Sequence, residues 1–149
     1  RFAFVDSDYI LERIPEYQSA QDQLETLSLN WQEEIERLYS EIDQLYKKYQ
    51  ADQILLTQNM KTKRESEIIN KEKMAKELQR KRFGPEGDLF VKRQELVKPI
   101  QDKVFNAIQD LALEKRYDII LDKSSELIML YANEDLDKSD DILKMLGHK

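Results

Sequence analysis

Residues 17–49 read YQSAQDQLETLSLNWQEEIERLYSEIDQLYKKY, and this stretch decides the fold. Apolar side chains recur in it at alternating intervals of three and four residues, which is the pattern of a coiled-coil seam. The interval from Trp31 to Ile35 is four where three is due, a stutter that unwinds a supercoil locally without ending the helix. We therefore predict one uninterrupted helix, whose buried stripe is formed by Tyr17, Ala20, Leu24, Leu27, Trp31, Ile35, Leu38, Ile42, Leu45 and Tyr49.

The same periodicity returns between residues 90 and 111, which predicts a second long helix pairing with the first as an antiparallel hairpin. We place the tip near residues 54–57, because Thr57 can cap the returning arm. The returning arm has few apolar seam residues before the break and more of them after it. The predicted seam residues are Met60, Ile68, Ile69, Ala75 and Leu78 before the break, and Phe90, Val97, Ile100, Val104, Ala107 and Leu111 after it.

The FGPEG sequence at residues 83–87 interrupts the returning arm, since Gly and Pro end helices. Antiparallel pairing places this break opposite the stutter, so Phe83 and Phe90 should pack near Leu29 and Trp31. Pro99 should add a kink, because its ring removes a backbone hydrogen bond. The predicted hinge residues are Phe83, Gly84, Pro85, Gly87 and Pro99.

The two ends of the chain have strand-like patterns. Residues 2–5 form an apolar run, and residues 117–122 and 127–132 predict a β-hairpin with a turn at 123–125. Short helices are predicted after Asp6 or Ser7 and over residues 140–146, the latter capped by Ser139. The expected fold is α+β and mostly α. A helical hairpin, residues 17–111, is attached to a small β-sheet body formed by residues 1–16 and 112–149.

Three short strands and two short helices cannot bury all the apolar side chains of these ends, because a small sheet has at most one covered face. Both predicted C-terminal strands are apolar on both faces. We therefore expect self-association through the sheet. The predicted interface residues are Phe2, Phe4, Ile119, Leu121, Ile128 and Leu130.

Charge is segregated along the chain, although the formal net charge is only −6. Residues 1–46 carry 3 basic and 11 acidic side chains, residues 47–82 carry 11 and 5, and residues 83–149 carry 10 and 14. One interpretation of the basic middle is a solvated helix face with i, i+4 pairs such as Glu67–Lys71. The other is attraction for acidic polypeptides or anionic membrane surfaces. Nucleic acid is not expected, because aromatic platforms and a recognition motif are absent there.

Other chemistry finds little support in the sequence. The chain has no cysteine, and residues 135–146 match the first three ligand positions of a calcium loop but have Asp140 and Leu146 where Gly and Glu are needed. His148 has no partner in sequence, and no set of nucleophile, base and orienting residue is present. We expect no metal, no cofactor and no enzymatic activity. No run of 18 apolar residues occurs, and we expect any signal peptide to have been removed.

Five short segments resemble the Skp/OmpH-type periplasmic chaperone family: FVDS at residues 4–7, FGPEG at 83–87, KPIQDKV at 98–104, YDIILD at 117–122 and SDDIL at 139–143. Their order and spacing extend the resemblance over essentially the whole chain. The resemblance implies an exported, ATP-independent homotrimer shaped like a jellyfish, in the periplasm, whose hairpins enclose unfolded outer-membrane β-barrel proteins in a cavity. The alternative is a coiled-coil structural adaptor that binds one folded envelope partner.

In the chaperone interpretation, the distal hairpin contacts the client. Apolar residues near the tip would add hydrophobic contacts with the client, since an adaptable Met beside leucines suits promiscuous binding. The basic residues of the returning arm, among them Arg82, would supply the electrostatic attraction. The predicted client-binding residues are Leu55, Leu56, Met60, Lys61, Lys63, Arg64, Lys71, Lys73, Lys76, Arg80 and Lys81.

Overall fold

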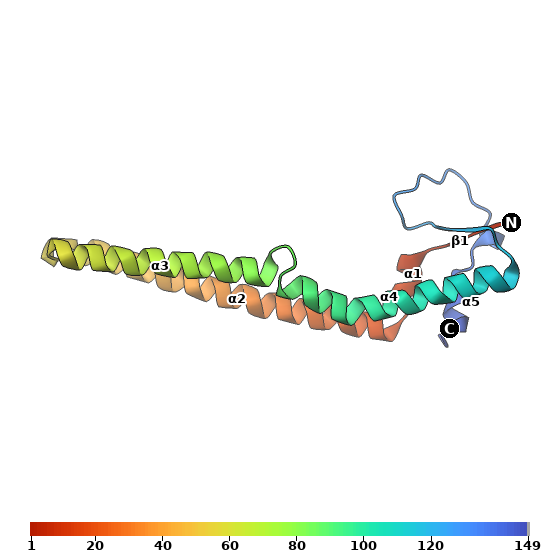
Figure 1. Cartoon of the computed structure of the whole chain (residues 1–149), viewed down its shortest axis with the longest axis horizontal. Coiled ribbons are helices and arrows are strands. Elements are labelled where there is room, and N and C mark those ends of the chain that lie inside the picture. Colours follow the sequence, from red (N-terminus) through yellow and green to blue (C-terminus); the bar gives the residue numbers. More distant parts are fainter. Residues whose placement is uncertain (149) are drawn as a thin grey trace. The chain divides into compact units, whose positions relative to one another are not determined.

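The computed structural model describes residues 1–148, and the chain forms two compact units. One unit is Leu24–Lys92, and the other joins Arg1–Gln23 to the residues from Arg93 onward. The long helices α2 (Pro15–Asp52) and α4 (Asp88–Lys115) each contribute residues to both units (Figure 1). Within residues 1–148, no helix is both long enough and apolar enough to cross a membrane.

The Leu24–Lys92 unit is a helical hairpin. Helix α2 leads through a short 3-10 helix, η1 (Gln53–Leu55), into α3 (Gln58–Phe83), which runs back beside α2 (Figure 1). The predicted seam of α2 is confirmed, because all ten of its residues are buried or partly buried. Helix α2 also continues through the stutter after Trp31 without interruption, as predicted.

The seam of α3 is sparse, as its sequence predicted. Ile68 and Ala75 are buried and join Ile42 and Tyr49 of α2 in one small cluster. The prediction that Met60 and Ile69 also lie in the seam was wrong, since both side chains are exposed. Their places at the three- and four-residue intervals are taken by partly buried basic side chains, Lys61, Arg64, Lys71 and Arg82. Long cationic side chains cover the seam with their methylene stems while their charged ends remain solvated.

The second half of the returning pattern is buried except at its start. Val97, Val104 and Leu111 of α4 are buried as predicted, whereas Phe90 is exposed. The prediction for Phe90 was wrong because α4 begins only at Asp88. Phe90 therefore lies in the first turn of a new helix, whose apolar stripe need not continue that of α3. Helix α4 continues through Pro99 as one element.

The other unit contains a two-stranded parallel sheet and three short helical elements. Strand β1 (Phe2–Val5) pairs with β2 (Ile119–Asp122) in the register Phe2 to Ile119 through Val5 to Asp122. Around the sheet lie α1 (Ser7–Glu12), η2 (Glu134–Leu136) and α5 (Ser139–Met145). Parallel strands need a long crossover connection, and the helical part of the chain supplies it.

The core of this unit forms between its short helices and α4. Ile10 of α1 and Ile142 and Leu143 of α5 have at most 1% of their surface exposed. They pack with Val5 of β1 and with Val104, Ala107 and Leu111 of α4. Ile120 is the residue of β2 that faces this core. The apolar ends of the chain are thus joined by packing, although more than 100 residues separate them in sequence.

The C-terminal β-hairpin that we predicted from the sequence does not form. Strand β2 forms, but residues 127–132 make no strand, and the segment extends away from the sheet as a loop (Figure 1). The chain after β2 instead returns to the sheet at Asp137, which bridges to Phe4 on the side of β1 away from β2, while the outer edge of β2 stays unpaired among the described residues. The backbone N–H of Lys138 donates to the carbonyl of Phe4, which closes that second side.

Polar groups hold the C-terminal end of β2 to the start of α1. The carboxylate of Asp122 accepts hydrogen bonds from the hydroxyl of Ser7 at 2.6 Å, from the backbone N–H of Ser7 at 3.1 Å and from the hydroxyl of Ser124 at 2.8 Å. Asp6 caps α1 by accepting from the backbone N–H of Tyr9, as predicted. The sequence interpretation did not identify the Asp122 network, because its members are far apart in the chain.

Ser139 acts differently from its prediction. It is the first residue of α5, and its hydroxyl donates to Asp137 at 2.7 Å and accepts from the backbone N–H of Asp6 at 2.8 Å. The prediction of Ser139 as a helix cap was therefore wrong. Its position beside β1 turns the side chain into a link between the two ends of the chain.

We expect replacement of Asp122 by asparagine to remove part of the pH dependence of stability. Burial opposes ionisation of Asp122, but hydrogen bonds from Ser7 and Ser124 outweigh it and lower the pKa of the carboxyl. A lowered folded-state pKa stabilises the protein at pH values above the unfolded-state pKa of ~3.9, and this contribution is lost as pH falls through the folded-state pKa. Urea unfolding from pH 7 down through that range should show a smaller acid-induced loss in Asp122→Asn than in the wild type. Equal losses would contradict the prediction.

Candidate functional site

The turn at the end of the hairpin is well ordered. The hydroxyl of Thr57 accepts from the backbone N–H of Met60 at 3.2 Å, which confirms Thr57 as the cap of α3. Leu56, which we predicted to contact a client as an exposed residue of the tip, is instead partly buried and packs against the cluster of Ile42, Tyr49, Ile68 and Ala75. The residues that project are Ile54, which the prediction omitted, and Leu55. Met60 is exposed on the first turn of α3.

Some basic residues of α3 form ion pairs with carboxylates of α2 across the hairpin. Arg64 lies 2.9 Å from Asp52, and Lys71 lies 4.0 Å from Glu41. Glu65 accepts a hydrogen bond from the hydroxyl of Tyr49, and this bond raises the pKa of Tyr49. These contacts step in opposite directions along the two helices, as antiparallel arms require. They align the arms where apolar contacts are few.

Most of the remaining basic residues of α3 face solvent. The i, i+4 pairs that the sequence suggested, such as Glu67 with Lys71, do not form among the described residues, and Lys71 instead reaches Glu41. Among residues 1–148, six predicted client-binding cations make no ion pair: Lys61, Lys63, Lys73, Lys76, Arg80 and Lys81. All but Lys61 are exposed. The arm therefore presents positive charge that the chain itself does not neutralise.

The break after α3 is tightly built. Gly84 caps α3 through its N–H, which donates to the carbonyl of Arg80 at 2.8 Å. A Cβ on Gly84 would lie 2.4 Å from that oxygen, and one on Gly87 would lie 2.7 Å from the carbonyl of Lys81. Only glycine avoids these contacts without a backbone shift. Pro85 is exposed between the two glycines.

Arg82 connects the break to α2. Its guanidinium lies 2.8 Å from Asp88 and 3.4 Å from Glu34, and it stacks 4.9 Å from the ring centroid of Trp31. Phe83 contacts the same ring edge-on at a centroid distance of 6.4 Å, so the predicted packing of Phe83 near Trp31 is confirmed. The spacing of the sequence placed the break opposite Trp31 but assigned Arg82 only to the general basic surface.

The predicted interface residues of the other unit are divided between a sheet face and a loop. Phe2, Ile119 and Leu121 are exposed on the strands, whereas Phe4 is buried. The loop at residues 127–132 exposes further apolar side chains, and two of them, Ile128 and Leu130, are 86% and 96% exposed. Exposed apolar surface of this extent on one unit is typical of an interaction site.

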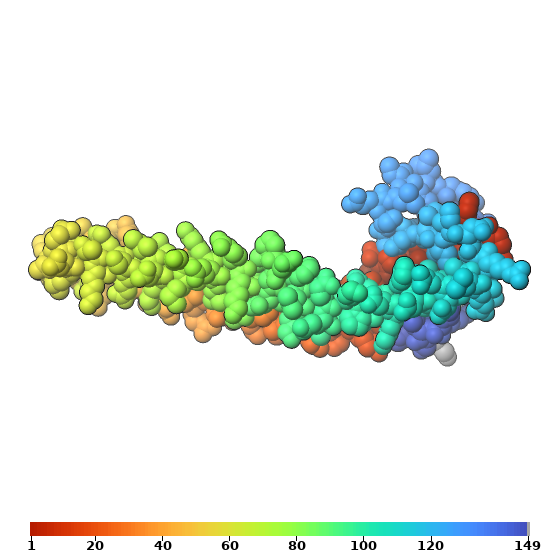
Figure 2. Space-filling model, viewed as in Figure 1, coloured from red at the N-terminus to blue at the C-terminus, as the bar shows by residue number. Residues whose placement is uncertain are grey.

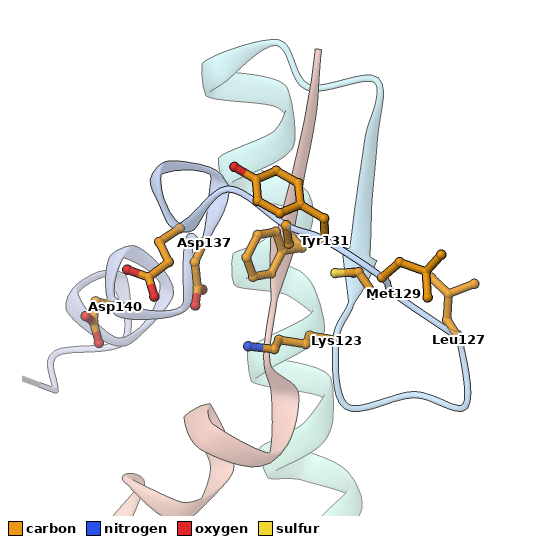
Figure 3. Close-up of a pocket in the computed structure, with 10 residues that line it drawn as sticks. Lys123, Leu127, Met129, Tyr131, Asp137 and Asp140 are labelled. Carbon is orange, nitrogen blue, oxygen red and sulfur yellow. The ribbon is translucent and has the colours of Figure 1, made fainter.

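A cavity of about 570 Å³ opens beneath this loop. In Figure 3, Tyr131 lies between Met129 and Leu127 on one side and Asp137 and Asp140 on the other. Phe4 forms part of the lining, and the ammonium of Lys123 lies 6.0 Å from its ring centroid. The lining is apolar toward the loop and acidic toward α5. Within residues 1–148, no three histidine or acidic side chains are grouped so as to hold a metal ion.

These features define a class of protein: a long antiparallel helical hairpin with a basic returning arm, joined to a small α/β body built from both ends of the chain. A model of the OmpH-like outer membrane protein family matches residues 1–146. The chain therefore belongs to the OmpH-like family.

One similar solved structure is a proposed outer membrane chaperone (OmpH-like) from Caulobacter crescentus CB15. It superposes with a TM-score of 0.76 at 16% sequence identity, and the match covers 97% of this chain and 82% of that one. At this identity the similarity establishes the fold. No curated protein matches the chain.

Proposed function

We propose that this protein is an ATP-independent chaperone that holds unfolded outer-membrane β-barrel proteins in the periplasm and prevents their aggregation. Membership of the OmpH-like family supports a chaperone role in general. The similar Caulobacter protein is described as an outer membrane chaperone, which agrees with this role. The proposal extends the role to one kind of client and one compartment.

The observation that carries the proposal is the unneutralised charge of α3. Its free cations lie on an arm whose seam contains few apolar contacts, so the surface is both charged and deformable. Such a surface can make many weak contacts with a flexible, acidic chain. Exposed apolar side chains on the same hairpin, among them Met60, Ile69 and Met74, add hydrophobic contacts. Many weak contacts allow a client to leave when it folds elsewhere.

We further propose that three copies assemble through the body, as the family resemblance implies. The exposed strand residues Phe2, Ile119 and Leu121 and the loop residues Ile128 and Leu130 would be buried by neighbouring copies. A strand edge from a second copy would also supply the partner that residues 127–132 lack within one chain. The hairpins of the three copies would then surround the client.

The direct test is suppression of aggregation. An outer-membrane β-barrel protein diluted from urea scatters light as it aggregates, and a stoichiometric amount of the assembled protein should suppress this scattering. No suppression would refute the holding activity. Isolation of one stoichiometric folded partner, with no capture of unfolded chains, would instead support a structural adaptor.

We expect charge reversal on α3 to weaken client capture. Replacing Lys63, Lys73, Lys76 and Lys81, which form no ion pair among the described residues, by glutamate should reduce capture by about tenfold or more at low salt, because electrostatic attraction accelerates association by such factors. The difference from wild type should shrink as salt rises. Fluorescence anisotropy of a labelled unfolded client at several salt concentrations measures this.

A matched control reverses four lysines of the other unit, Lys98, Lys103, Lys115 and Lys144, and should change capture much less. The oligomeric mass of both variants is measured first, so that loss of assembly is not mistaken for loss of binding. Unchanged capture in the α3 variant at every salt concentration would show that its charge is not used.

A further inference from the structure

The two helices of the hairpin carry opposite charge on their outer edges. The outer edge of each helix is the face opposite the seam, where exposed charged residues recur at helical intervals. Figure 2 shows α3 (yellow to green) along one long side of the hairpin and part of α2 (orange) along the other. The acidic edge of α2 and the basic edge of α3 are formed, respectively, by Glu25, Glu33, Glu36 and Asp43, and by Lys73, Lys76 and Arg80.

Most of this charge is not neutralised within the chain. Each edge also carries a residue of the opposite sign, Lys47 on the acidic edge and Glu77 on the basic edge, and Lys47 pairs with Asp43 at 2.9 Å. The other three carboxylates of the acidic edge and all three cations of the basic edge form no ion pair with another residue among 1–148. Because both edges lie opposite the seam, they point away from each other. One chain therefore cannot bring its own two edges together.

The two charged edges lie at the same level along the hairpin. Ion pairs between the helices place residues 34–41 of α2 beside residues 71–82 of α3. All three cations of the basic edge lie within this segment of α3. On α2, Glu36 lies within the matching segment, and Glu33 and Asp43 lie just outside it. A second hairpin placed alongside the first, parallel and without a shift, would thus bring the basic edge of one against the acidic edge of the other.

We propose that the hairpins of neighbouring copies pair in this way in the assembled protein, with the basic edge of one copy on the acidic edge of the next. This inference rests on the proposed assembly of several copies and deepens the proposed function. A contact between two different faces of one chain is head-to-tail, and such contacts close into rings when a rotation relates the copies. Copies in a ring whose axis runs along the hairpins stand at the same level, which is where the two edges match.

The pairing gives the client a role in opening the ring of hairpins. An acidic unfolded chain offers carboxylates to the same cations that hold the neighbouring acidic edge. Client and neighbour therefore compete for the basic edge, so the hairpins stay together until a client separates them. Salt should separate them too, because exposed charges are screened.

Engineered cysteines test the pairing, since the chain has no cysteine of its own. Lys47→Cys lies on the acidic edge, and Ser66→Cys lies on the basic edge, seven residues before Lys73. The hydrogen bond between Tyr49 and Glu65 places these two positions at nearly the same level. A disulfide needs Cα atoms within about 7 Å, whereas helix axes ~8–10 Å apart keep the opposite edges of one hairpin farther apart than this. Oxidation of the assembled double variant should therefore link neighbouring copies, giving covalent dimers and trimers on a non-reducing gel.

The matched controls are the two single variants, Lys47→Cys and Ser66→Cys. Each can form a disulfide only when two identical edges meet, and identical edges carry like charge. Neither single variant should give covalent dimers under the same conditions. Light scattering before oxidation measures the mass of every variant, so that lost assembly is not mistaken for lost pairing.

Charge reversal in the double-cysteine protein separates electrostatic pairing from chance collision. Replacing Glu33, Glu36 and Asp43 by lysine should abolish the crosslink, and so should replacing the three cations of the basic edge by glutamate. Combining the two sets should restore it, because opposite charges face each other again. The crosslink should also weaken between ~0.1 M and ~1 M salt, where the screening length falls from about 10 Å to about 3 Å. An unfolded acidic β-barrel protein added before oxidation should weaken it as well.

Several results would overturn the pairing: no crosslink in an assembled double variant, equal crosslinking in the single-cysteine controls, a crosslink that survives either reversal, or no recovery when both sets are combined. Covalent species heavier than the assembly would place the contact between assemblies and overturn it too. A crosslink unaffected by client would overturn the competition.

The outcomes also distinguish this inference from the proposed function. A mass of one chain before oxidation would overturn the proposed assembly and the pairing with it. If the hairpins crosslink as expected but the protein suppresses no aggregation, the chaperone proposal fails and the pairing stands. If the assembled protein suppresses aggregation without forming the crosslink, only the pairing fails.

Discussion

Replacing Ile119 and Leu121 together by aspartate is expected to convert the proposed trimer into folded monomers. Both side chains project from β2 on the face opposite the core, and they are 48% and 40% exposed in the single chain. A carboxylate buried without a partner at an interface costs several kcal/mol, which exceeds what the rest of a small interface can offset. Light scattering with size-exclusion chromatography should report the mass of one chain. Circular dichroism should show the helical content unchanged, because neither residue belongs to the core.

The matched control places aspartate at Phe105 and Leu113, which are 59% and 80% exposed on α4. These positions are apolar and exposed but are not on the sheet, so the assembly should keep its mass. An Ile119/Leu121 variant that keeps the wild-type mass would show that the sheet face is not the assembly surface. The exposed loop at residues 127–132 would then be examined in the same way.

Replacing Ile142 by alanine is expected to lower the free energy of unfolding by about 2–5 kcal/mol, the range for a large aliphatic side chain removed from a packed core. Ile142 has no exposed surface and contributes to the cluster that holds α5 against α1 and α4. The loss combines the transfer of the side chain with the cavity that remains. Because the proposed assembly would add to the apparent stability, urea unfolding is measured at one protein concentration, and in the Ile119/Leu121 background as well.

The control for this variant is Met145→Ala, in the same short helix. Met145 is 42% exposed, so its truncation should change the free energy of unfolding by less than about 1 kcal/mol. A small effect at Ile142, equal to that at Met145, would mean that α5 is not essential to the core of this unit.

The hairpin could be predicted because its determinants are local. The three- and four-residue spacing from Tyr17 to Tyr49 established the buried face of α2, and the burial of all ten seam residues confirms it. Thr57 marked the start of α3, and the two glycines after Phe83 marked its end. Each of these signals acts within a few residues of the chain, where backbone geometry and hydrogen bonding follow directly from side-chain type.

Details of the candidate site were predicted less well. Leu55 and Leu56 are adjacent residues of the same type. Leu56 packs inward and Leu55 projects, because Leu55 ends the 3-10 helix and Leu56 follows it in extended conformation. Met60 and Ile69 were expected in the seam and are exposed, while basic side chains occupy it. When apolar residues are few, the local sequence pattern does not determine which face of a helix is buried. Packing against the partner helix determines it.

The sequence by itself determined the helical hairpin, its tip, its break and its basic arm, since periodicity, capping and charge are properties of neighbouring residues. Only the tertiary structure decided the parallel pairing of β1 with β2, the failure of residues 127–132 to form a strand, and the Ser7–Asp122–Ser124 network. The strand pairing and the network join residues more than 100 positions apart, and the fate of residues 127–132 depends on where the chain after β2 returns to the sheet. Such information is absent from local sequence and arises only when the two ends of the chain meet.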